Sequence, residues 1–406
     1  MRSARTDKTT PSFNVAAKGQ THDGTQTSVT TDRIFTMHFD FSDEQKALRD
    51  SFRRNLEKNC PISSVRAIID SAAGHDAALW RNLSQGGFLA AAIPEAFGGA
   101  GAGYLELCVV AEECGRALAP LPTVSSVYQA TEFLLAAGSA AQKAAWLPKL
   151  ASGGAIGTLA LAERPGETTP SSIEARVVGG RLTAIKIPVA DGMAADIALV
   201  LARDERNALS LFLARLSQAE VERTPVKTID PSRKHARLVF NRAEVEPVGE
   251  PGQGWKLLEA IRDRAAVLVA FEQIGGADRA LTMARDYALQ RFAFGRQIGS
   301  FQAIKHMLVD MYVSLELARS NCYFGAWALS ANSESLPAAA ARARLAATAA
   351  YQLCSTNNIQ VHGGMGFTWE FDCHLYYRRS NYLALALGGP ALWESRLIGQ
   401  IRPAAA

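Results

Sequence analysis

Hydrophobic and polar residues follow two different periods along the chain, and the changes of period divide it into three regions. Up to about residue 155, and again after about residue 250, apolar residues recur three or four positions apart, which is typical of one face of an α-helix. Between these regions, short apolar or alternating runs predict β-strands. The order helical, β, helical indicates an α+β fold.

The N-terminal region, residues 37–155, is expected to fold as a set of amphipathic helices. Ser42 begins a Ser-Asp-Glu-Gln sequence that suits a helix N-cap with acidic and amide side chains in the first turn. Apolar residues continue at helical spacing from there through Phe52. The same spacing predicts further helices over residues 78–87, 105–118, 124–137 and 141–150.

The central region, residues 156–250, is expected to be a small β domain. Short apolar or alternating runs predict strands over residues 158–162, 181–187, 197–201, 209–213 and 237–240. The pair Gly179-Gly180 directly precedes the second run. It suits a tight hairpin turn, because glycine adopts positive φ at little cost.

Helical spacing resumes at Trp255 and defines the C-terminal region, residues 251–406. It predicts three long helices over residues 255–288, 302–331 and 337–361, followed by a shorter last helix. Together these helices predict a bundle. A chain of 406 residues rarely folds around a single core, so several domains agree with its length.

Residues 1–36 differ from the rest of the chain. They are rich in Ser and Thr and show no apolar period, which predicts a disordered extension. The absence of an apolar stretch argues against a secretory signal, and Asp7, Asp23 and Asp32 argue against a transit peptide. Met37 directly precedes the first patterned segment and is a candidate start, so whether the extension belongs to the native protein stays open.

Composition narrows the class of protein. With 48% apolar and 20% charged residues, the chain is typical of a soluble globular protein, and its net charge of +4 argues against a nucleic-acid binder. No apolar run approaches the roughly 20 residues that a membrane span needs. The six cysteines form no C-x-x-C pair, so buried reduced thiols in the cytoplasm are expected. No spacing of His and Cys indicates a metal site.

A group of residues suited to binding follows the first long C-terminal helix. It reads R-x-x-F-G-x-x-I-x-x-F-Q-A-x-x-H and contains Arg291, Phe294, Phe301 and Gln302. A planar guanidinium binds phosphate through parallel hydrogen bonds, and a glycine turn lets the backbone approach a ligand closely. A cation, aromatic rings, a glycine turn and an amide between two helices indicate a site for a nucleotide diphosphate.

A second element reads Q-x-x-G-G-x-G-F-x-x-E and contains Gln360, Gly363 and Gly364. A helix C-cap followed by a turn explains these glycines in part, but it does not explain both elements. The glycines of residues 98–103 are different, because no strand precedes them and no βαβ unit surrounds them. They are expected to serve backbone conformation rather than a dinucleotide.

Taken together, these elements resemble the acyl-CoA dehydrogenases. The two C-terminal elements resemble that family's flavin-binding segments, and residues 93–101 resemble its P-E-x-F-G-G-x-G loop. The resemblance extends from about residue 38 to the end of the chain. It implies an N-terminal helical domain, a central small β-barrel domain and a C-terminal four-helix bundle.

The resemblance also implies a function, which is the FAD-dependent α,β-dehydrogenation of a CoA thioester. The residues expected to contact FAD, on a neighbouring subunit, are Arg291, Phe294, Phe301, Gln302, Gln360, Gly363 and Gly364. An electron-transferring flavoprotein is the expected acceptor, and a homologous subunit completes a dimer or tetramer. The sequence does not identify the acyl group, which could come from a fatty acid, a steroid side chain or a dicarboxylate.

The chain departs from the family where a Glu base is expected. One family position lies in an E-G-T or E-G-S element that follows an R-D-A segment, and here Leu387 stands in it. The other lies on the helix after G-x-G-W, where this chain has Ala265. Neither side chain can accept a proton. Segments 161–168 and 187–190, which resemble the family's flavin-ring contacts, also depart from its pattern.

The chain thus keeps the segments that resemble the family's nucleotide-binding elements and departs from it at the base and at the flavin ring. Three hypotheses follow from this contrast. The chain is the base-lacking subunit of a hetero-oligomeric dehydrogenase whose partner supplies the Glu, or it is self-sufficient with a displaced base, or it is a non-catalytic scaffold that binds flavin or acyl-CoA. The substitute base in the second hypothesis is Asp263. It lies two residues before Ala265, about half a helical turn away, so it points in another direction. The acyl-CoA oxidases share the fold and stay an alternative.

Overall fold

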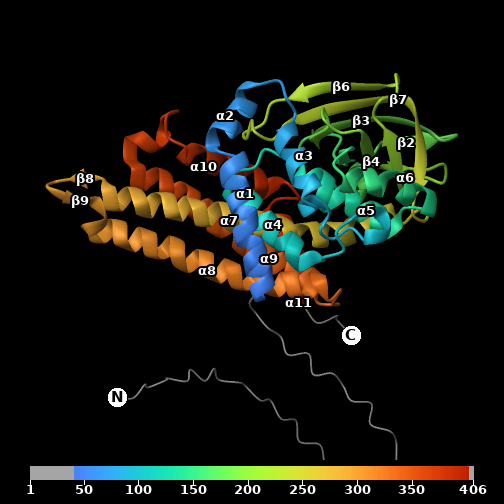
Figure 1. Cartoon of the computed structure of the whole chain (residues 1–406). Coiled ribbons are helices and arrows are strands. Elements are labelled where there is room, and N and C mark those ends of the chain that lie inside the picture. Colours follow the sequence, from blue (N-terminus) through green and yellow to red (C-terminus); the bar gives the residue numbers. More distant parts are fainter. Residues whose placement is uncertain (1–40, 402–406) are drawn as a thin grey trace, which may run out of the picture. The chain divides into compact units, whose positions relative to one another are not determined.

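A computed structural model describes residues 41–401, and Figure 1 shows how their helices and strands are arranged. The first part of this range is helical, as predicted. Its helices are α1 (Asp43–Asn59), α2 (Ile62–Asp70), α3 (Ala77–Gln85), α4 (Tyr104–Arg116), α5 (Thr131–Ala137) and α6 (Ala140–Ala151). The predicted cap at Ser42 is present, because its side chain accepts a hydrogen bond from the backbone of Gln45 while the Gln45 side chain bonds back to Ser42.

Two local features of this part differ from the sequence prediction. Helix α2 was not predicted, although Ile62, Val65 and Ile69 recur at helical spacing, because it has only nine residues and only Val65 among them is fully buried. The single helix predicted over residues 124–137 is a π-helical turn, η3 (Thr123–Ala130), followed by α5. Ser125 donates to Asp191 and Ser126 accepts from the backbone of Gly157, long-range contacts that apolar spacing does not record.

The glycine-rich loop before α4 has the backbone role expected of it. It follows two short 3₁₀ turns, η1 (Phe88–Ala90) and η2 (Glu95–Phe97). Gly98 and Gly101 have positive φ values of 76° and 60°. A Cβ atom on Gly99 would lie 2.0 Å from the carbonyl oxygen of Ile93, so no other residue fits there.

The central part is a β-barrel with two additional strands. Its strands are β1 (Gly157–Ala160), β2 (Arg176–Val178), β3 (Arg181–Ala190), β4 (Ile197–Arg203), β5 (Leu209–Arg215), β6 (Val221–Val226) and β7 (His235–Val248). The sheet runs β1-β4-β2-β3-β7-β5, and β5 pairs back with β4, which closes the ring. Strands β4 and β5 are antiparallel and place Leu199 opposite Leu213. Both residues are buried, so the barrel interior is apolar.

Most predicted strands are present, with different lengths. The hairpin at Gly179-Gly180 is confirmed, since both residues have positive φ and join β2 to β3. Strand β6 was missed because none of its side chains is fully buried. Strand β7 extends well beyond the predicted residues 237–240, because its second half carries polar residues that pair with other strands at the surface.

The C-terminal part consists of three long helices and two shorter ones within the described range. They are α7 (Gly254–Gln290), α8 (Gln302–Ser330), α9 (Leu336–His362), α10 (Cys373–Leu385) and α11 (Pro390–Ile401). The prediction of a single shorter helix after the three long ones is wrong. Two shorter helices follow, because Gly388 and Gly389 separate α10 from α11, and both pack on α9. Helix α7 is central, and every residue from 265 to 277 in it is buried.

Close backbone approach fixes α7 against its neighbours. A Cβ atom on Gly275 would lie 1.8 Å from the carbonyl oxygen of Glu112, so α4 lies directly against α7 at this point. On the other side, Gly276 leaves room for the ring of Tyr351 from α9. Larger residues at either glycine would separate these helices.

Some predictions fall outside what the structure tests. The predicted extension over residues 1–36 lies outside the described residues, and the division at residues 155 and 250 stays a prediction. No helix within residues 41–401 combines the length and the apolar character needed to cross a bilayer. All six cysteines are buried and free, as expected.

Candidate functional site

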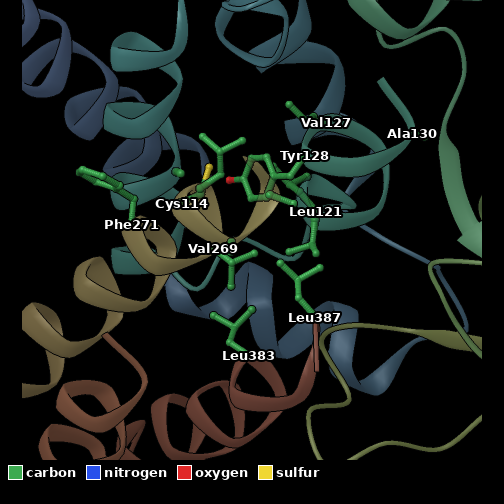
Figure 2. Close-up of a cluster of buried hydrophobic side chains, with 14 of the residues drawn as sticks. Cys114, Leu121, Val127, Tyr128, Ala130, Val269, Phe271, Leu383 and Leu387 are labelled. Carbon is green, nitrogen blue, oxygen red and sulfur yellow. The ribbon is translucent and has the colours of Figure 1, made fainter. Parts of the chain in front are cut away.

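Two buried apolar side chains occupy the positions where a base was sought. Ala265 lies on α7 and is fully buried, and Leu387 follows the end of α10 and is 5% exposed. Figure 2 shows Leu387 in a cluster of buried hydrophobic side chains with Val269 and Leu383. The surroundings of Leu387 are therefore apolar as well as its own side chain.

The loop that carries Leu387 is held in place from two directions. Trp393 on α11 donates its indole N–H to the carbonyl oxygen of Gly388 at 3.2 Å. Arg344 on α9, which is buried, donates to the carbonyl oxygen of Leu383 in the last turn of α10. The same carbonyl accepts a long hydrogen bond of 3.4 Å from the backbone of Ala386, so Arg344 adds a second donor at this helix end. These contacts hold the loop that carries Leu387.

Asp263, the candidate substitute base, is engaged in an ion pair. Arg396 on α11 donates to both of its carboxylate oxygens, at 2.7 Å and 2.8 Å. Burial raises the pKa of Asp263, and Arg396 opposes that rise. Because one guanidinium bonds to both oxygens, the Asp263 carboxylate is held toward α11.

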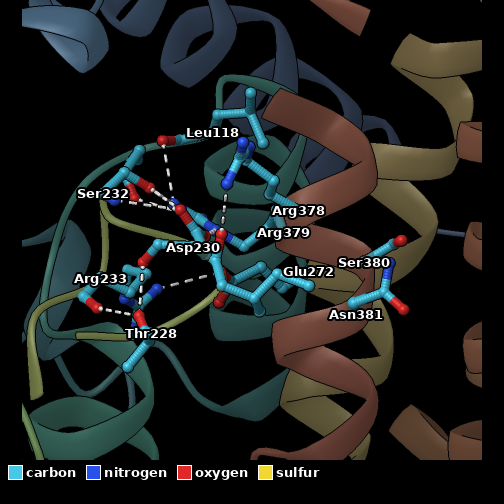
Figure 3. Close-up of polar contacts among 12 residues, drawn as sticks. Leu118, Thr228, Asp230, Ser232, Arg233, Glu272, Arg378, Arg379, Ser380 and Asn381 are labelled. Atoms are coloured by element: carbon cyan, nitrogen blue, oxygen red, sulfur yellow. Dashed lines mark hydrogen bonds and ion pairs between the residues drawn. The ribbon is translucent and has the colours of Figure 1, made fainter. Parts of the chain in front are cut away.

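A second buried carboxylate, Glu272, belongs to a network of charges that Figure 3 shows. Its Oε1 atom lies 3.3 Å from Arg233 and 3.4 Å from Arg379, and all three side chains are about 1% exposed. Arg379 also pairs with Asp230 and donates to Ser232 at 2.8 Å. The network joins the loop between β6 and β7 to helices α7 and α10.

The electrostatics of this network favour fixed ionised groups. Burial disfavours the charge on Asp230, but Arg379 and the hydrogen bonds from Ser232 outweigh it and hold the pKa of Asp230 below its usual value. Asp230 therefore stays ionised, and Glu272 lies between two guanidiniums. Their geometry is that of a structural ion network rather than of an acid and base pair poised for proton transfer.

The predicted nucleotide-binding residues after α7 lie together in a small hairpin. Strands β8 (Phe292–Ala293) and β9 (Arg296–Gln297) pair, with Phe294 and Gly295 in the turn at positive φ. Phe294 is 95% exposed and meets Phe301 edge to face, with ring centroids 6.2 Å apart. Arg291 is the exposed C-cap of α7 and Gln302 is the exposed first residue of α8.

The second predicted element lies at the end of α9. Gln360 is exposed in its last turn, and Gly363 follows with φ of 59°. His362 stacks on Tyr287 of α7 with ring centroids 4.1 Å apart. Since Tyr287 is one turn before Arg291, the structure brings both predicted elements to the same end of the helices.

The residues present fit the diphosphate and adenosine half of FAD, judged by their donors and by the open space around them. Arg291, Gln302 and Gln360 offer a guanidinium and two amides at the surface. Cβ atoms built on Gly363 and Gly364 would meet nothing within 4 Å, so a ligand can approach the backbone there. The exposed apolar neighbours Phe292, Met365, Phe367 and Trp369 were missed by the sequence analysis. The sequence could have indicated them, because Phe292 lies within the first motif and the other three lie within the second.

Comparison with known proteins identifies the family. Family models of the acyl-CoA dehydrogenase N-terminal and C-terminal domains match residues 42–154 and 252–391. The chain is 36% identical to acyl-CoA dehydrogenase IpdE2 of Mycobacterium tuberculosis over 361 residues, which cover 88% of this chain and 98% of the relative. This chain belongs to the acyl-CoA dehydrogenase family. Its members are oxidoreductases that act on CH–CH groups.

Two solved structures are similar to this chain over most of its length. The ChsE4-ChsE5 complex from Mycobacterium tuberculosis gives a TM-score of 0.82 at 28% identity and covers 91% of this chain and 100% of that chain. A variant of the steroid acyl-CoA dehydrogenase Tcur3481-Tcur3483 gives 0.80 at 28% identity, covering 88% and 98%. As an acyl-CoA dehydrogenase, the chain thus has the expected order of N-terminal helices, central barrel and C-terminal helices.

Proposed function

We propose that this acyl-CoA dehydrogenase is the base-lacking subunit of a hetero-oligomer whose homologous partner supplies the catalytic Glu. One observation carries the proposal, namely that Ala265 and Leu387, at both family base positions, are apolar and buried. Dehydrogenation of a thioester removes a proton from the α carbon, and a carboxylate must stand within hydrogen-bond reach to accept it. This chain has none at either position.

The acidic residues nearest to these positions do not replace the missing base. Both oxygens of Asp263 accept hydrogen bonds from Arg396, and Glu272 lies between Arg233 and Arg379. Moving Asp263 toward a substrate would break both of its hydrogen bonds to Arg396, and moving Glu272 would leave the buried Arg233 with Asp191 at 3.9 Å, a loss that costs several kcal/mol for a buried pair. A base on another subunit avoids that cost.

The second part of the proposal is that the chain binds FAD. Arg291 would pair with the diphosphate, while Gln302 and Gln360 would donate to its polar groups and Phe294 would cover the nucleotide. Gly363 and Gly364 leave space for backbone contact. When bound, FAD supplies the acceptor for the hydride that leaves the β carbon. The chain's own residues bind and orient the cofactor, and all of them lie at the surface, where a neighbouring subunit can share it.

Relatives support a paired assembly. One similar structure is a complex of ChsE4 with ChsE5, and another is a steroid acyl-CoA dehydrogenase named for two components. We therefore propose a CoA thioester of a steroid side chain or fatty acid as the substrate, with an electron-transferring flavoprotein as the acceptor. The buried free thiols suit a reducing compartment, so we place the assembly in the cytoplasm.

Co-expression of the full chain with a homologue encoded beside it tests the proposal. We expect the pair to co-purify, to show the visible absorption of bound flavin and to oxidise acyl-CoA. The chain alone is expected to give little flavin and no turnover. Full flavin occupancy together with turnover by the chain alone would overturn the proposal.

The displaced-base alternative has its own test in the same assembly. Asp263→Asn keeps the side-chain shape and part of the bonding to Arg396. If the partner supplies the base, turnover by the pair should change by less than about threefold, since that is the effect of a small conformational adjustment. Loss of activity with unchanged flavin content would instead identify Asp263 as the base.

A further inference from the structure

Arg262 on α7 is buried and has no polar partner in the part of the chain that the structure describes. It is 8% exposed, and no side chain or carbonyl within residues 41–401 accepts a hydrogen bond from its guanidinium or forms an ion pair with it. The ring centre of Trp255 lies 5.9 Å from the guanidinium carbon. Buried arginines are almost always paired, so this one needs an explanation.

The charges around Arg262 increase its need for a partner. Arg396 is a second cation nearby, and the acids next to Arg262, Glu259 and Asp263, are both bonded to Arg396 instead. Burial, followed by the repulsion from Arg396, lowers the pKa of Arg262. A guanidinium nevertheless keeps its proton in proteins, so Arg262 carries a charge that has no ion-pair partner within residues 41–401. Its nitrogen atoms are not among the fully buried ones without a hydrogen bond, so they keep some contact with solvent, from which a ligand can reach them.

Other buried arginines show how this fold normally compensates such a charge. Arg233 and Arg379, each about 1% exposed, lie within 3.4 Å of Glu272. Arg344 has no carboxylate but donates to Thr348 at 2.9 Å, to Gln273 and to the carbonyl oxygen of Leu383. Arg262 has none of these contacts, so its compensation is expected from outside the described residues.

The position of Arg262 places it beside the reaction centre of the family. It precedes Ala265 by three residues on α7, so the two Cβ atoms are neighbours on one face of the helix. Glu167, in the loop between β1 and β2, is one of the acids whose charge acts on Arg262.

We propose that Arg262 binds an oxyanion of a ligand, a phosphate or a carboxylate, on the face of α7 that carries Ala265. The guanidinium fork matches either group with two parallel hydrogen bonds, and Trp255 limits its orientation. A phosphate would come from the CoA part of a thioester, and a carboxylate from its acyl part. The inference does not depend on the proposed function, because the ion can bind whether or not a partner supplies a base.

Binding of defined probes to the purified full chain tests the inference. The probes are coenzyme A, dephospho-coenzyme A, pyrophosphate and glutarate, each measured by calorimetry. We expect at least one probe to bind, and Arg262→Gln to weaken it at least about tenfold, because charge-assisted hydrogen bonds are lost. Arg262→Lys should weaken binding less, since it keeps the charge but not the fork. Lys256→Gln, an exposed change of equal charge on the same helix, should leave binding within about twofold.

The set of probes distinguishes the two sources of the anion. Binding of coenzyme A and pyrophosphate through Arg262 identifies a phosphate, and binding of glutarate identifies a carboxylate. Equal affinity of Arg262→Gln and the unchanged chain for every probe would overturn the inference, as would the absence of binding by all four probes.

A stability measurement separates ligand binding from a structural role. Without ligand, Arg262→Met should raise the thermal midpoint, because it replaces an uncompensated buried charge with an apolar chain of similar length. A structural role predicts the opposite, a lower midpoint. A lower midpoint in Arg262→Met with unchanged probe affinity in Arg262→Lys would therefore contradict the inference.

Discussion

Glu272 and Lys186 illustrate how single charged residues are used inside this protein. Each is almost fully buried and each has an oppositely charged partner, so each is held inside the protein instead of being free to react with a substrate. By contrast, Ala265 and Leu387 keep acid groups away from the positions where the chemistry would need one. The buried charges of Glu272 and Lys186 therefore lie at other positions than Ala265 and Leu387, the two places where a base was expected.

Replacing Glu272 tests its structural role. Glu272→Gln removes the carboxylate between Arg233 and Arg379 and leaves Arg233 with only Asp191, at 3.9 Å. The free energy of unfolding should fall by about 3–5 kcal/mol, as it does when one member of a buried ion pair is removed. Chemical denaturation measures the loss, and Glu250→Gln, an exposed carboxylate, should change stability by less than about 0.5 kcal/mol. Equal effects of the two changes would contradict the network.

Lys186 predicts how stability depends on pH. Its ammonium group is fully buried and bonds to Glu163 at 2.7 Å and to the carbonyl oxygens of Leu161 and Leu201. Burial lowers the pKa of Lys186 from 10.5 to about 8, with Glu163 opposing. Below pH 8 both the folded and the unfolded chain hold the proton, so the cost of burying the charge is fully present.

Between these two pKa values the unfolded chain holds a proton that the folded chain releases. The free energy of unfolding should therefore rise with pH in this window, by at most about 1.4 kcal/mol per pH unit. Denaturation curves recorded from about pH 7.5 to about pH 10 measure the slope. Lys186→Met should remove this contribution, and an identical slope in the variant and the unchanged chain would refute the assignment.

At the scale of helices and strands, the spacing of apolar residues predicted those elements whose side chains are buried at regular intervals. The long helix α7 and the short strands β4 and β5 were found because their apolar residues are continuous or regular. Helix α2 and strand β6 were missed because their side chains lie largely at the surface. Tertiary contacts, rather than local preference, hold such elements in place.

The candidate site was predictable to a similar degree. Arg291 and Gly363 were proposed from motifs, because glycine turns and a cation at helix ends have a direct chemical meaning, and the structure brings them to the same end of the helices. Arg262 was missed, since a single arginine in a helix is ordinary until its burial and its missing partner are known. The ion pair of Asp263 with Arg396 was equally out of reach, because 133 residues separate the two.

A glycine substitution tests the proposed cofactor-binding element. Gly363 and Gly179 have almost equal φ values, 59° and 57°, and open space where a Cβ atom would lie. Replacing either with Ala should cost about 1–3 kcal/mol of stability, because both backbone conformations disfavour a residue with a Cβ atom; Gly363, with ψ of −139°, lies in a region that is nearly confined to glycine. Only Gly363→Ala should reduce flavin content in the assembly, which visible absorption measures. Equal flavin content in both variants would exclude Gly363 from the cofactor site.

At the scale of the whole molecule, the chain combines exposed groups suited to a nucleotide with apolar residues, Ala265 and Leu387, at the two positions where we expected a base. Exposed aromatic and apolar residues surround the nucleotide-binding element, among them Phe294 and Phe367. Apolar surface of this kind beside a binding motif is typical of a contact with another subunit. A divided active site explains both features at once.

Exchange of the α hydrogen of an acyl-CoA thioester tests the central claim most directly, because it requires a base but no electron transfer. The purified chain and the co-purified pair are each incubated with an acyl-CoA thioester in deuterated buffer, and deuterium at C2 is measured by mass spectrometry. The chain alone should exchange no faster than buffer, whereas the pair should exchange rapidly. Rapid exchange by the chain alone would show that this polypeptide contains its own base.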